Sequence, residues 1–319
     1  MNNAYLRLEN ITKSYPIRAG AWIKTTAWLR AVNNVSLSID KGETLGLVGE
    51  SGCGKSTLGK IACGLEKPSS GNVILAGKKI EASTDLLKSK KIQMIFQDPF
   101  ASLNPRQKIK NIISEPLTIH RVGSAKFIRD KTIELMQKVG LSESHMSRYP
   151  HEFSGGQRQR IAIARAISLD PDMVICDEPV SALDVSVQAQ ILKLLKQLQK
   201  DLDLSYMFIS HDLSVVKYLC TRISVMYLGE LVETAGKNEL YQSPCHPYTK
   251  ALLAAIPVPD PEIKSRSLMI ASEPPNPLNP PSGCHFHPRC PRKMDICSTQ
   301  RPGWTKISSN QSVRCFLYE

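Results

Sequence analysis

The sequence predicts an α/β fold built around a phosphate-binding loop, and three observations support this fold class. A short apolar run, Thr44–Val48, leads into a glycine-rich loop and then into a stretch with helical spacing at 55–64. A second apolar run, Met173–Cys176, ends in an acidic pair. Hydrophobic residues make up 42% of the 319 residues, which is enough for one large core plus an additional region.

The loop Gly49–Thr57 has the spacing G-x-x-x-x-G-K-S. Its glycines let the backbone fold tightly and direct successive N–H groups into one concavity, which suits phosphate oxygens. Lys55 opens the following helix, so we expect its ammonium group and the helix N-terminus to meet the β- and γ-phosphates together. The Ser56 hydroxyl is placed for Mg²⁺. The predicted phosphate-binding residues are Gly49, Glu50, Ser51, Gly52, Cys53, Gly54, Lys55, Ser56 and Thr57.

The acidic pair that ends the second apolar run fits the same chemistry. Asp177 is suited to hold Mg²⁺ from the outer coordination shell. Glu178, one residue further on, is suited to orient a water against the γ-phosphate and to accept its proton. The sequence therefore predicts hydrolysis of a nucleoside triphosphate with Glu178 as the general base.

With further motifs in the same order, the chain resembles the ATP-binding cassette (ABC) ATPases over about residues 5–240. The resemblance implies a phosphate-loop NTPase core of ABC type with an antiparallel β subdomain and an α-helical subdomain. It implies that Tyr15 stacks on adenine and that Gln97, after the strand Ile92–Phe96, touches Mg²⁺ and the attacking water. His211, after the strand Tyr206–Ile209, matches the histidine that contacts the γ-phosphate. The implied magnesium residues are Ser56, Gln97 and Asp177.

A second glycine-rich motif matches the signature of that family. Ser154 precedes the helix-like stretch Gln157–Ile167 and is expected to cap it with its hydroxyl, while two glycines allow a phosphate to approach closely. The resemblance implies a head-to-tail pair of ATPases with two nucleotides between loop and signature, and Asp184 matches the loop that meets the opposite subunit. The implied residues are Ser154, Gly155, Gly156, Gln157 and Asp184.

The stretch Phe96–Arg106 reads Phe-Gln-Asp-Pro-Phe-Ala-Ser-Leu-Asn-Pro-Arg, which resembles the oligopeptide/dipeptide importer ATPases. In importers this region leads into a helical subdomain that accepts a short helix of the membrane subunit. We expect a further short helix at His246–Leu253, with proline near its start. Residues 17–30 carry cationic and no acidic side chains; we expect a surface excursion between two strands, with a membrane-surface contact as the alternative.

The C-terminal part differs in composition from the rest. Eight prolines between Pro257 and Pro281 predict an extended connector. We divide the chain into an ABC domain at 1–256, with the helical subdomain at about 98–170, a Pro-rich linker at 257–283 and a small Cys-rich tail at 284–319.

Four cysteines cluster in the tail, whereas the other five are dispersed and are expected to act as small apolar residues. Structural disulfides are not expected in the cytosol, so clustered thiols favour a metal that stabilises a tail with little core of its own. The resemblance to peptide-importer ATPases implies a [4Fe–4S] cluster, with Zn²⁺ as the alternative. The predicted ligands are Cys284, Cys290, Cys297 and Cys315.

The formal net charge of +12 suits either nucleic acid or the anionic surface of a membrane. The sequence shows neither an apolar run long enough to span a bilayer nor a signal-peptide pattern, so we expect a cytosolic chain. The resemblance implies an ATPase (ATP, Mg²⁺) that energises peptide import from the cytoplasmic face of the membrane. Its implied partners are a homologous second ATPase, two permease subunits and, indirectly, an extracytoplasmic peptide-binding protein, with no nucleic acid.

Three alternatives remain open at this point. A nickel or metallophore importer ATPase has much the same sequence features. A soluble cassette ATPase that acts on nucleic acid belongs to another functional class and usually carries two cassettes or long insertions. A metal or redox protein with incidental ATP binding would place the chemistry in the cysteine tail.

Overall fold

The structure is a computed structural model that describes residues 4–19, 24–80, 90–256 and 273–319. These residues form two compact units. The loop unit, named for the phosphate-binding loop, contains the described residues of 4–39, 44–80 and 209–319. The signature unit contains residues 40–43 and the described residues of 81–208.

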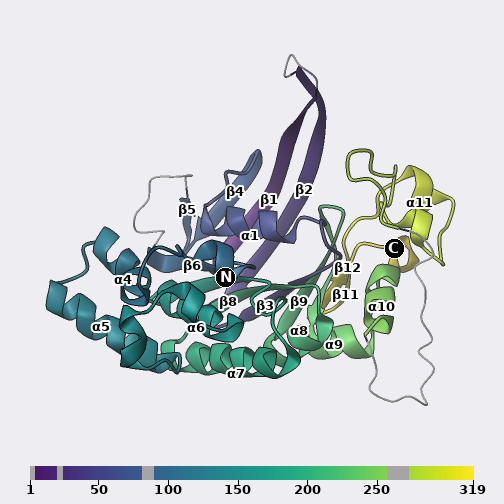
Figure 1. The fold of residues 1–319 in the computed structure, drawn as a ribbon. Helices are drawn as coiled ribbons and strands as arrows, with labels where there is room; N and C mark the ends of the chain where they lie inside the picture. Colours follow the sequence, from purple (N-terminus) through teal and green to yellow (C-terminus); the bar gives the residue numbers. More distant parts are fainter. Residues whose placement is uncertain (1–3, 20–23, 81–89, 257–272) are drawn as a thin grey trace. The chain divides into compact units, whose positions relative to one another are not determined.

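An antiparallel sheet in the loop unit has the strand order β2-β1-β4-β5. Its strands are β1 (Ala4–Ala19), β2 (Lys24–Asp40), β4 (Ser70–Leu75) and β5 (Lys78–Ile80). Pairing Leu6 with Leu75 and Leu8 with Val73 places four apolar side chains on one face of the sheet. This is the expected antiparallel β subdomain, and Figure 1 shows β1 and β2 running side by side as a long ribbon. The described part of the predicted excursion, 17–19 and 24–30, continues these two strands.

The same unit contains five further strands in the order β11-β12-β10-β9-β3. They are β3 (Thr44–Val48), β9 (Arg222–Tyr227), β10 (Glu230–Gly236), β11 (Thr305–Ser308) and β12 (Gln311–Val313). The fully buried β3 is parallel to β9, as expected for an apolar run covered on both faces. The helices are α1 (Lys55–Cys63), α8 (Leu213–Leu219), α9 (Lys237–Gln242) and α10 (Pro247–Ala254). The short helix predicted from His246 is confirmed as α10, with His246 as its N-cap.

The Cys-rich tail is part of the loop unit rather than an independent body. Its strand β12 pairs antiparallel with β10, with Gln311 opposite Ala235 and Val313 opposite Glu233. The tail also contains η3 (His287–Arg289), α11 (Ile296–Thr299) and η4 (Phe316–Tyr318). Phe286 is buried, so the tail shares the core of this unit. Most of the predicted linker, 257–272, lies outside the described residues.

In the signature unit, β6 (Ile92–Ile95) pairs parallel with β7 (Met173–Asp177), and the next strand of the sheet is β8 (Ser205–Ser210), which begins in this unit. The helical part follows β6 in the chain, as predicted (Figure 1). It comprises α3 (Pro99–Ser102), α4 (Ile109–Ile119), α5 (Ala125–Lys138), η1 (Glu143–Ser147), η2 (Pro150–Glu152) and α6 (Gly155–Ala166). The longest helix, α7 (Val185–Leu202), comes after β7. None of the helices within the described ranges is long and apolar enough to cross a membrane.

Candidate functional site

The phosphate-binding loop connects β3 to α1, and two of its glycines have no space around them for a side chain. Gly54 has a φ of +106°, and a Cβ added there would lie 2.1 Å from the carbonyl oxygen of Ala31. A Cβ at Gly49 would lie 2.1 Å from the carbonyl oxygen of Met226. The backbone therefore dictates glycine at both positions, as the spacing of the motif predicts.

Lys55 lies inside this loop. Its ammonium group donates hydrogen bonds to the carbonyl oxygens of Gly49 at 2.8 Å and Glu50 at 2.9 Å, and the residue is only 3% exposed. Gly54 occupies the N-cap of α1, where no side chain of the described chain caps the helix. No side chain of the described residues therefore competes with an anion for this helix start, and Lys55 adds a positive charge beside it.

The predicted loop residues differ in what they offer to a ligand. Ser51 and Gly52 are exposed, and Ser56 and Thr57 are half-buried. The Cys53 thiol is buried, and burial raises its pKa, so this residue can contribute its backbone N–H but not a thiolate.

In the signature unit the structure brings two predicted catalytic residues together. Gln97 Nε2 donates a hydrogen bond to Glu178 Oε2 at 3.0 Å. Asp177 ends the fully buried strand β7 and is 4% exposed. Glu178 adopts a φ of +46°, an uncommon left-handed conformation for a residue other than glycine, and its carbonyl oxygen accepts a hydrogen bond from the Ser181 hydroxyl at 3.1 Å. The turn after β7 thus aims the Glu178 carboxylate at Gln97.

The signature begins helix α6 with a reciprocal cap. The Ser154 hydroxyl accepts a hydrogen bond from the Gln157 N–H at 3.3 Å, and the Gln157 side chain accepts one from the Ser154 N–H at 3.1 Å. Ser154 therefore caps this helix as predicted. Gly155 is exposed, whereas a Cβ at Gly156 would lie 2.4 Å from Val187 Cγ1. Gly156 thus has a packing reason to be glycine besides any approach of phosphate.

Asp184 lies close to the signature in the same unit, since the neighbouring Leu183 and Val187 are the residues that pack against Gly155 and Gly156. Its carboxylate caps α7 by accepting a hydrogen bond from the Val187 N–H at 2.9 Å. Hydrogen bonds from the Ser186 hydroxyl and from Val187 lower its pKa. Asp184 is therefore an exposed, ionised cap.

Two predicted residues lie in the loop unit away from the loop in sequence. His211 follows β8 and is exposed, directly before Asp212, which caps α8. Tyr15 lies half-buried in β1, with the Lys13 ammonium group 5.0 Å from the centre of its ring. Tyr15 therefore stays a prediction for adenine stacking.

The four tail cysteines line one recess. His246, Phe286, Phe316 and Leu317 are among the other lining residues. Burial raises the pKa of Cys284 to about 11 and raises those of Cys290 and Cys315. Within the described ranges, no three His, Cys, Asp or Glu side chains are grouped closely enough to hold a single metal ion. The dispersed cysteines Cys53, Cys176, Cys220 and Cys245 are buried and Cys63 is half-buried, as expected for apolar packing.

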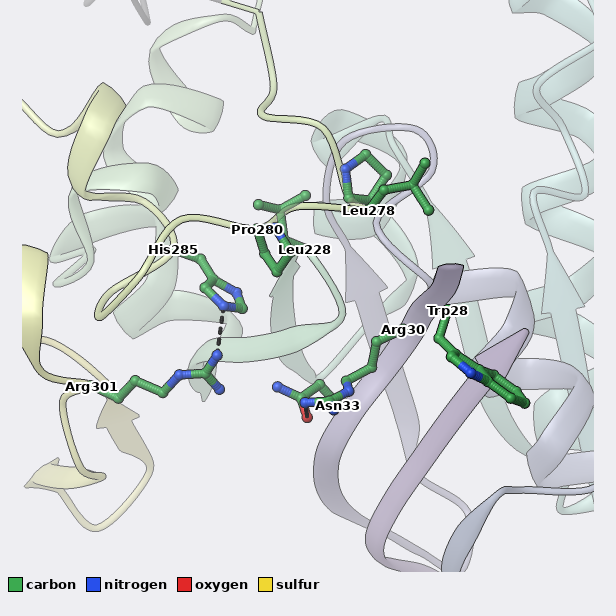
Figure 2. A pocket seen from close by; sticks show the side chains of 9 residues that line it. Trp28, Arg30, Asn33, Leu228, Leu278, Pro280, His285 and Arg301 are labelled. Carbon is green, nitrogen blue, oxygen red and sulfur yellow. Dashed lines mark hydrogen bonds between the residues drawn. The ribbon is translucent and has the colours of Figure 1, made fainter. Parts of the chain in front are cut away.

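A second recess of the loop unit, of about 220 Å³, contains none of the predicted site residues (Figure 2). Trp28 and Arg30 of β2 line one side, and His285 and Arg301 of the tail line another. Arg301 donates to His285 Nε2 at 2.8 Å and pairs with Glu230 at 2.5 Å. Because Glu230 offsets its charge, Arg301 serves to hold the tail on β10.

These features define an ABC-type ATPase, in which a phosphate-binding loop, an acidic pair after a buried strand and a capped glycine signature share one α/β fold. The family model described as "ABC transporter" matches residues 32–181. The model described as "Oligopeptide/dipeptide transporter, C-terminal region" matches residues 232–297.

Similarity to known proteins extends along nearly the whole chain. The oligopeptide transport ATP-binding protein AppF of Bacillus subtilis (strain 168) is 49% identical over 319 residues, which cover 98% of this chain and 97% of AppF. The oligopeptide transport ATP-binding protein OppF of Escherichia coli (strain K12) is 52% identical and covers 90% of this chain and 87% of OppF. The solved dimer of the ATP-binding cassette MJ0796, bound to ADP and phosphate, is 31% identical with a TM-score of 0.64, covering 73% of this chain and 98% of that one. The chain belongs to the ABC transporter ATP-binding proteins, in the oligopeptide/dipeptide transporter group.

Proposed function

We infer that this chain is the ATP-binding, ATP-hydrolysing subunit that energises import of di- and oligopeptides. The observation that carries this inference is the combination of both ATPase motifs with a C-terminal region of the oligopeptide/dipeptide transporter type, in a chain about half identical to peptide transport ATP-binding proteins. The same C-terminal match favours peptides over nickel or metallophores as cargo.

The roles we propose follow from the contacts in each unit. Lys55 and the N–H groups of the loop would bind the β- and γ-phosphates, and Ser56, Gln97 and Asp177 would hold Mg²⁺, which offsets charge on the phosphates. Glu178 accepts the proton of the attacking water, and its hydrogen bond from Gln97 holds the carboxylate in one orientation before ATP arrives. His211 and the signature residues of the partner contact the γ-phosphate.

Hydrolysis in this scheme needs a second ATPase, because the signature of one chain completes the site of the other. The exposed Gly155 beside Leu183, next to the Asp184 cap, gives the signature unit a surface suited to that partner. The relative MJ0796 was solved as a dimer, which supports this arrangement. We propose a homologous rather than identical partner. ATP binds the closed pair more tightly than the open pair, and this difference in affinity moves the permease.

A recess of about 490 Å³ in the signature unit is the docking site that we propose for a permease helix. It lies between α4, α5 and η1, and its lining includes Lys110, Ser114, Arg129 and Met146. Its mix of cationic and small side chains with apolar Ile128 and Met146 suits a short amphipathic helix. Two permease subunits, and indirectly an external peptide-binding protein, would place this chain peripherally on the cytoplasmic face of the membrane.

For the tail we propose a [4Fe–4S] cluster held by Cys284, Cys290, Cys297 and Cys315, with Zn²⁺ as the alternative. The donor set fits, since four thiols line one recess that Phe286, Phe316 and Leu317 help to enclose. When bound, the group would cross-link the tail through its four cysteines. Because burial raises the thiol pKa values, binding would have to displace the thiol protons. Iron, sulfide and zinc analysis of the purified chain and of Cys297→Ser separates the two.

The test of the function uses the chain purified with the membrane subunits that accompany it, reconstituted in vesicles. Peptide-stimulated ATP hydrolysis and peptide uptake are measured for wild type and Glu178→Gln. We expect the variant to bind ATP normally and to lose hydrolysis by about 10²–10⁴-fold. Asp201→Asn, an exposed acid on α7, is the matched control. Stimulation by nucleic acid instead of peptide, or unchanged turnover in Glu178→Gln, would refute the proposal.

A further inference from the structure

Arg289 in the Cys-rich tail forms a bidentate ion pair with Glu50, the second residue of the phosphate-binding loop. Its Nη1 and Nη2 donate to the two carboxylate oxygens of Glu50, each at 2.9 Å. Nη1 also lies 3.3 Å from the Tyr227 hydroxyl. The Arg289 side chain is 4% exposed and that of Glu50 is 23% exposed, so the pair is largely shielded from water. Two parallel, charge-assisted hydrogen bonds of this kind fix both position and angle.

The backbone of Glu50 is held as well. Its N–H donates to the hydroxyl of Tyr248 at 2.9 Å, and its carbonyl oxygen accepts from the Lys55 ammonium group at 2.9 Å. Tyr248 comes from α10, and its ring lies 4.6 Å from that of Tyr227, centre to centre. Every polar group of Glu50 therefore has a partner, and one residue of the loop is fixed by α10, by the tail and by the phosphate-binding lysine.

The charge of Glu50 gives this contact a consequence for the ligand. A carboxylate within a loop that receives a triphosphate repels that ligand unless a cation offsets it. Lys55 is the cation that we propose to bind the phosphates, and its hydrogen bonds within the loop go to the carbonyl oxygens of Gly49 and Glu50 rather than to the Glu50 carboxylate. Arg289 supplies the offsetting charge from outside the loop motif.

Arg289 is also tied to the cysteine recess. It ends the single turn η3, whose next residue is Cys290, and its N–H donates to the carbonyl oxygen of Phe286 at 3.0 Å. The Phe286 ring packs against both Tyr227 and Tyr248, with centres 5.3 and 5.4 Å apart. A displacement of the turn between Cys284 and Cys290 would therefore move the guanidinium group that holds the loop.

We propose that Arg289 is a positioning residue of the ATP site: it clamps and neutralises Glu50, so that affinity for ATP depends on the seating of the Cys-rich tail. The inference rests on the proposed function, because it concerns the same nucleotide site. It adds a residue from beyond the ATPase motifs and gives the tail a role in nucleotide binding.

The test measures ATP binding to the full-length chain, and KM and kcat in the reconstituted complex, for Arg289→Met, Glu50→Gln and the double variant. We expect Arg289→Met to weaken ATP binding and raise KM by about tenfold, since it leaves Glu50 uncompensated beside the phosphates, with kcat at saturating ATP little changed. Glu50→Gln removes the charge and keeps one of the two hydrogen bonds, since an amide offers a single acceptor oxygen, and it should bind ATP within about threefold of wild type. The double variant should regain the affinity of Glu50→Gln.

ATP binding, KM and kcat are also measured for two further single variants. Arg289→Lys keeps the charge but loses the fork, so an intermediate KM is expected. Lys306→Met, which replaces an exposed cation on β11 of the tail, should behave as wild type. An ATP affinity of Arg289→Met within about twofold of wild type, or a double variant as weak as Arg289→Met, would overturn the clamp. If Arg289→Met does not fold, the ATP affinity of the double variant is compared with that of Glu50→Gln. A folded double variant that does not match the affinity of Glu50→Gln would overturn the proposal.

Failure of the clamp and failure of the proposed function have different signatures. A wild-type complex that does not couple ATP hydrolysis to peptide uptake contradicts the function. A wild-type complex that does so, with unaltered ATP affinity in Arg289→Met, contradicts the clamp alone.

Discussion

The two glycine-rich motifs of this protein precede helices in different ways, and the contrast explains what each is built to do. In the phosphate-binding loop, Gly54 takes a left-handed φ at the N-cap of α1, and no side chain of the described chain caps that helix. In the signature, Ser154 and Gln157 cap α6 reciprocally. No side chain caps the helix that follows the loop, whereas the signature helix has its Gln157 N–H capped within its own chain and presents an exposed Gly155 to a partner.

This contrast predicts different kinds of defect. Changes in the loop should weaken ATP binding by the chain alone. Changes at the signature should leave that binding intact and reduce hydrolysis only where two ATPases meet. The predictions below test this separation, from the largest expected effect to the smallest.

The largest effect is expected for Gly54→Ala. The added Cβ would lie 2.1 Å from the Ala31 carbonyl oxygen at a φ of +106°, so the loop must move. A displacement of about 1 Å at the phosphate site is expected to weaken ATP binding by about 100-fold or more. Binding is measured by titration calorimetry on the isolated chain.

Gly77→Ala provides the matched control for Gly54→Ala. Gly77 has a similar left-handed φ of +78°, but a Cβ there would meet nothing within 4 Å. It should cost only the strain of alanine in that conformation, about 1–2 kcal/mol, with normal ATP affinity. Equal loss of ATP binding in both variants would show that strain, rather than the close approach at Gly54, governs the loop.

Gly155→Val tests the signature side. Because Gly155 is exposed and its nearest neighbour is the flexible end of Leu183, 3.2 Å from an added Cβ, the fold should tolerate the change. ATP affinity of the isolated chain should equal that of wild type, while ATP turnover of the assembled complex should fall by at least about tenfold. Full turnover with valine in every signature of the complex would contradict the shared site.

Gly156 cannot be used to test the contact with the partner, because it packs against Val187 of its own chain. We expect Gly156→Ala to destabilise the fold by about 1–3 kcal/mol, because the added Cβ would lie 2.4 Å from Val187. Val187→Ala should restore part of this stability in the double variant, which is measured by thermal unfolding. A Gly156→Ala chain as stable as wild type would remove the packing explanation.

Acidification should destabilise the region that supports the phosphate-binding loop. His246 caps α10, the helix that supplies Tyr248 to the loop, and burial lowers its pKa to about 3. Because this folded-state pKa lies below the ordinary value of about 6.5, the stabilisation is complete above pH 6.5 and is lost as the pH falls toward 3. The difference in thermal midpoint between wild type and His246→Asn should therefore change below pH 6.5. A constant difference from pH 7.5 to 4.5 would contradict the buried neutral histidine.

A contact of this protein can be predicted from the sequence when the residues that form it are close together in the chain. The strand, loop and first helix, the acidic pair after β7 and the Ser154 cap are each specified within about ten residues, so their pattern is visible in the chain. The packing of Gly156 on Val187 is less visible, because 31 positions separate the two residues and nothing in either local pattern joins them.

The tail shows where such reasoning stops. The sequence predicts a tail with little core of its own, and it does not predict that β12 pairs with β10 or that Phe286 is buried in the loop unit. A strand of three residues, Gln311–Val313, is too short to carry a periodic signal. Arg289 and Glu50 are 239 positions apart, so only the folded chain reveals their contact.

The smallest effect is expected at the signature cap itself. Ser154→Ala removes one hydrogen bond to the Gln157 N–H and should cost about 1 kcal/mol, or a few degrees in the thermal midpoint. Ser124→Ala removes the equivalent cap of α5, a bond of the same 3.3 Å length to Phe127, and should lower the midpoint by a similar amount. Only Ser154→Ala should also slow ATP turnover in the assembled complex, because only that hydroxyl lies where the partner's nucleotide is expected. Equal turnover in the two variants would reduce Ser154 to a helix cap and assign the contact with the partner's nucleotide to the glycines alone.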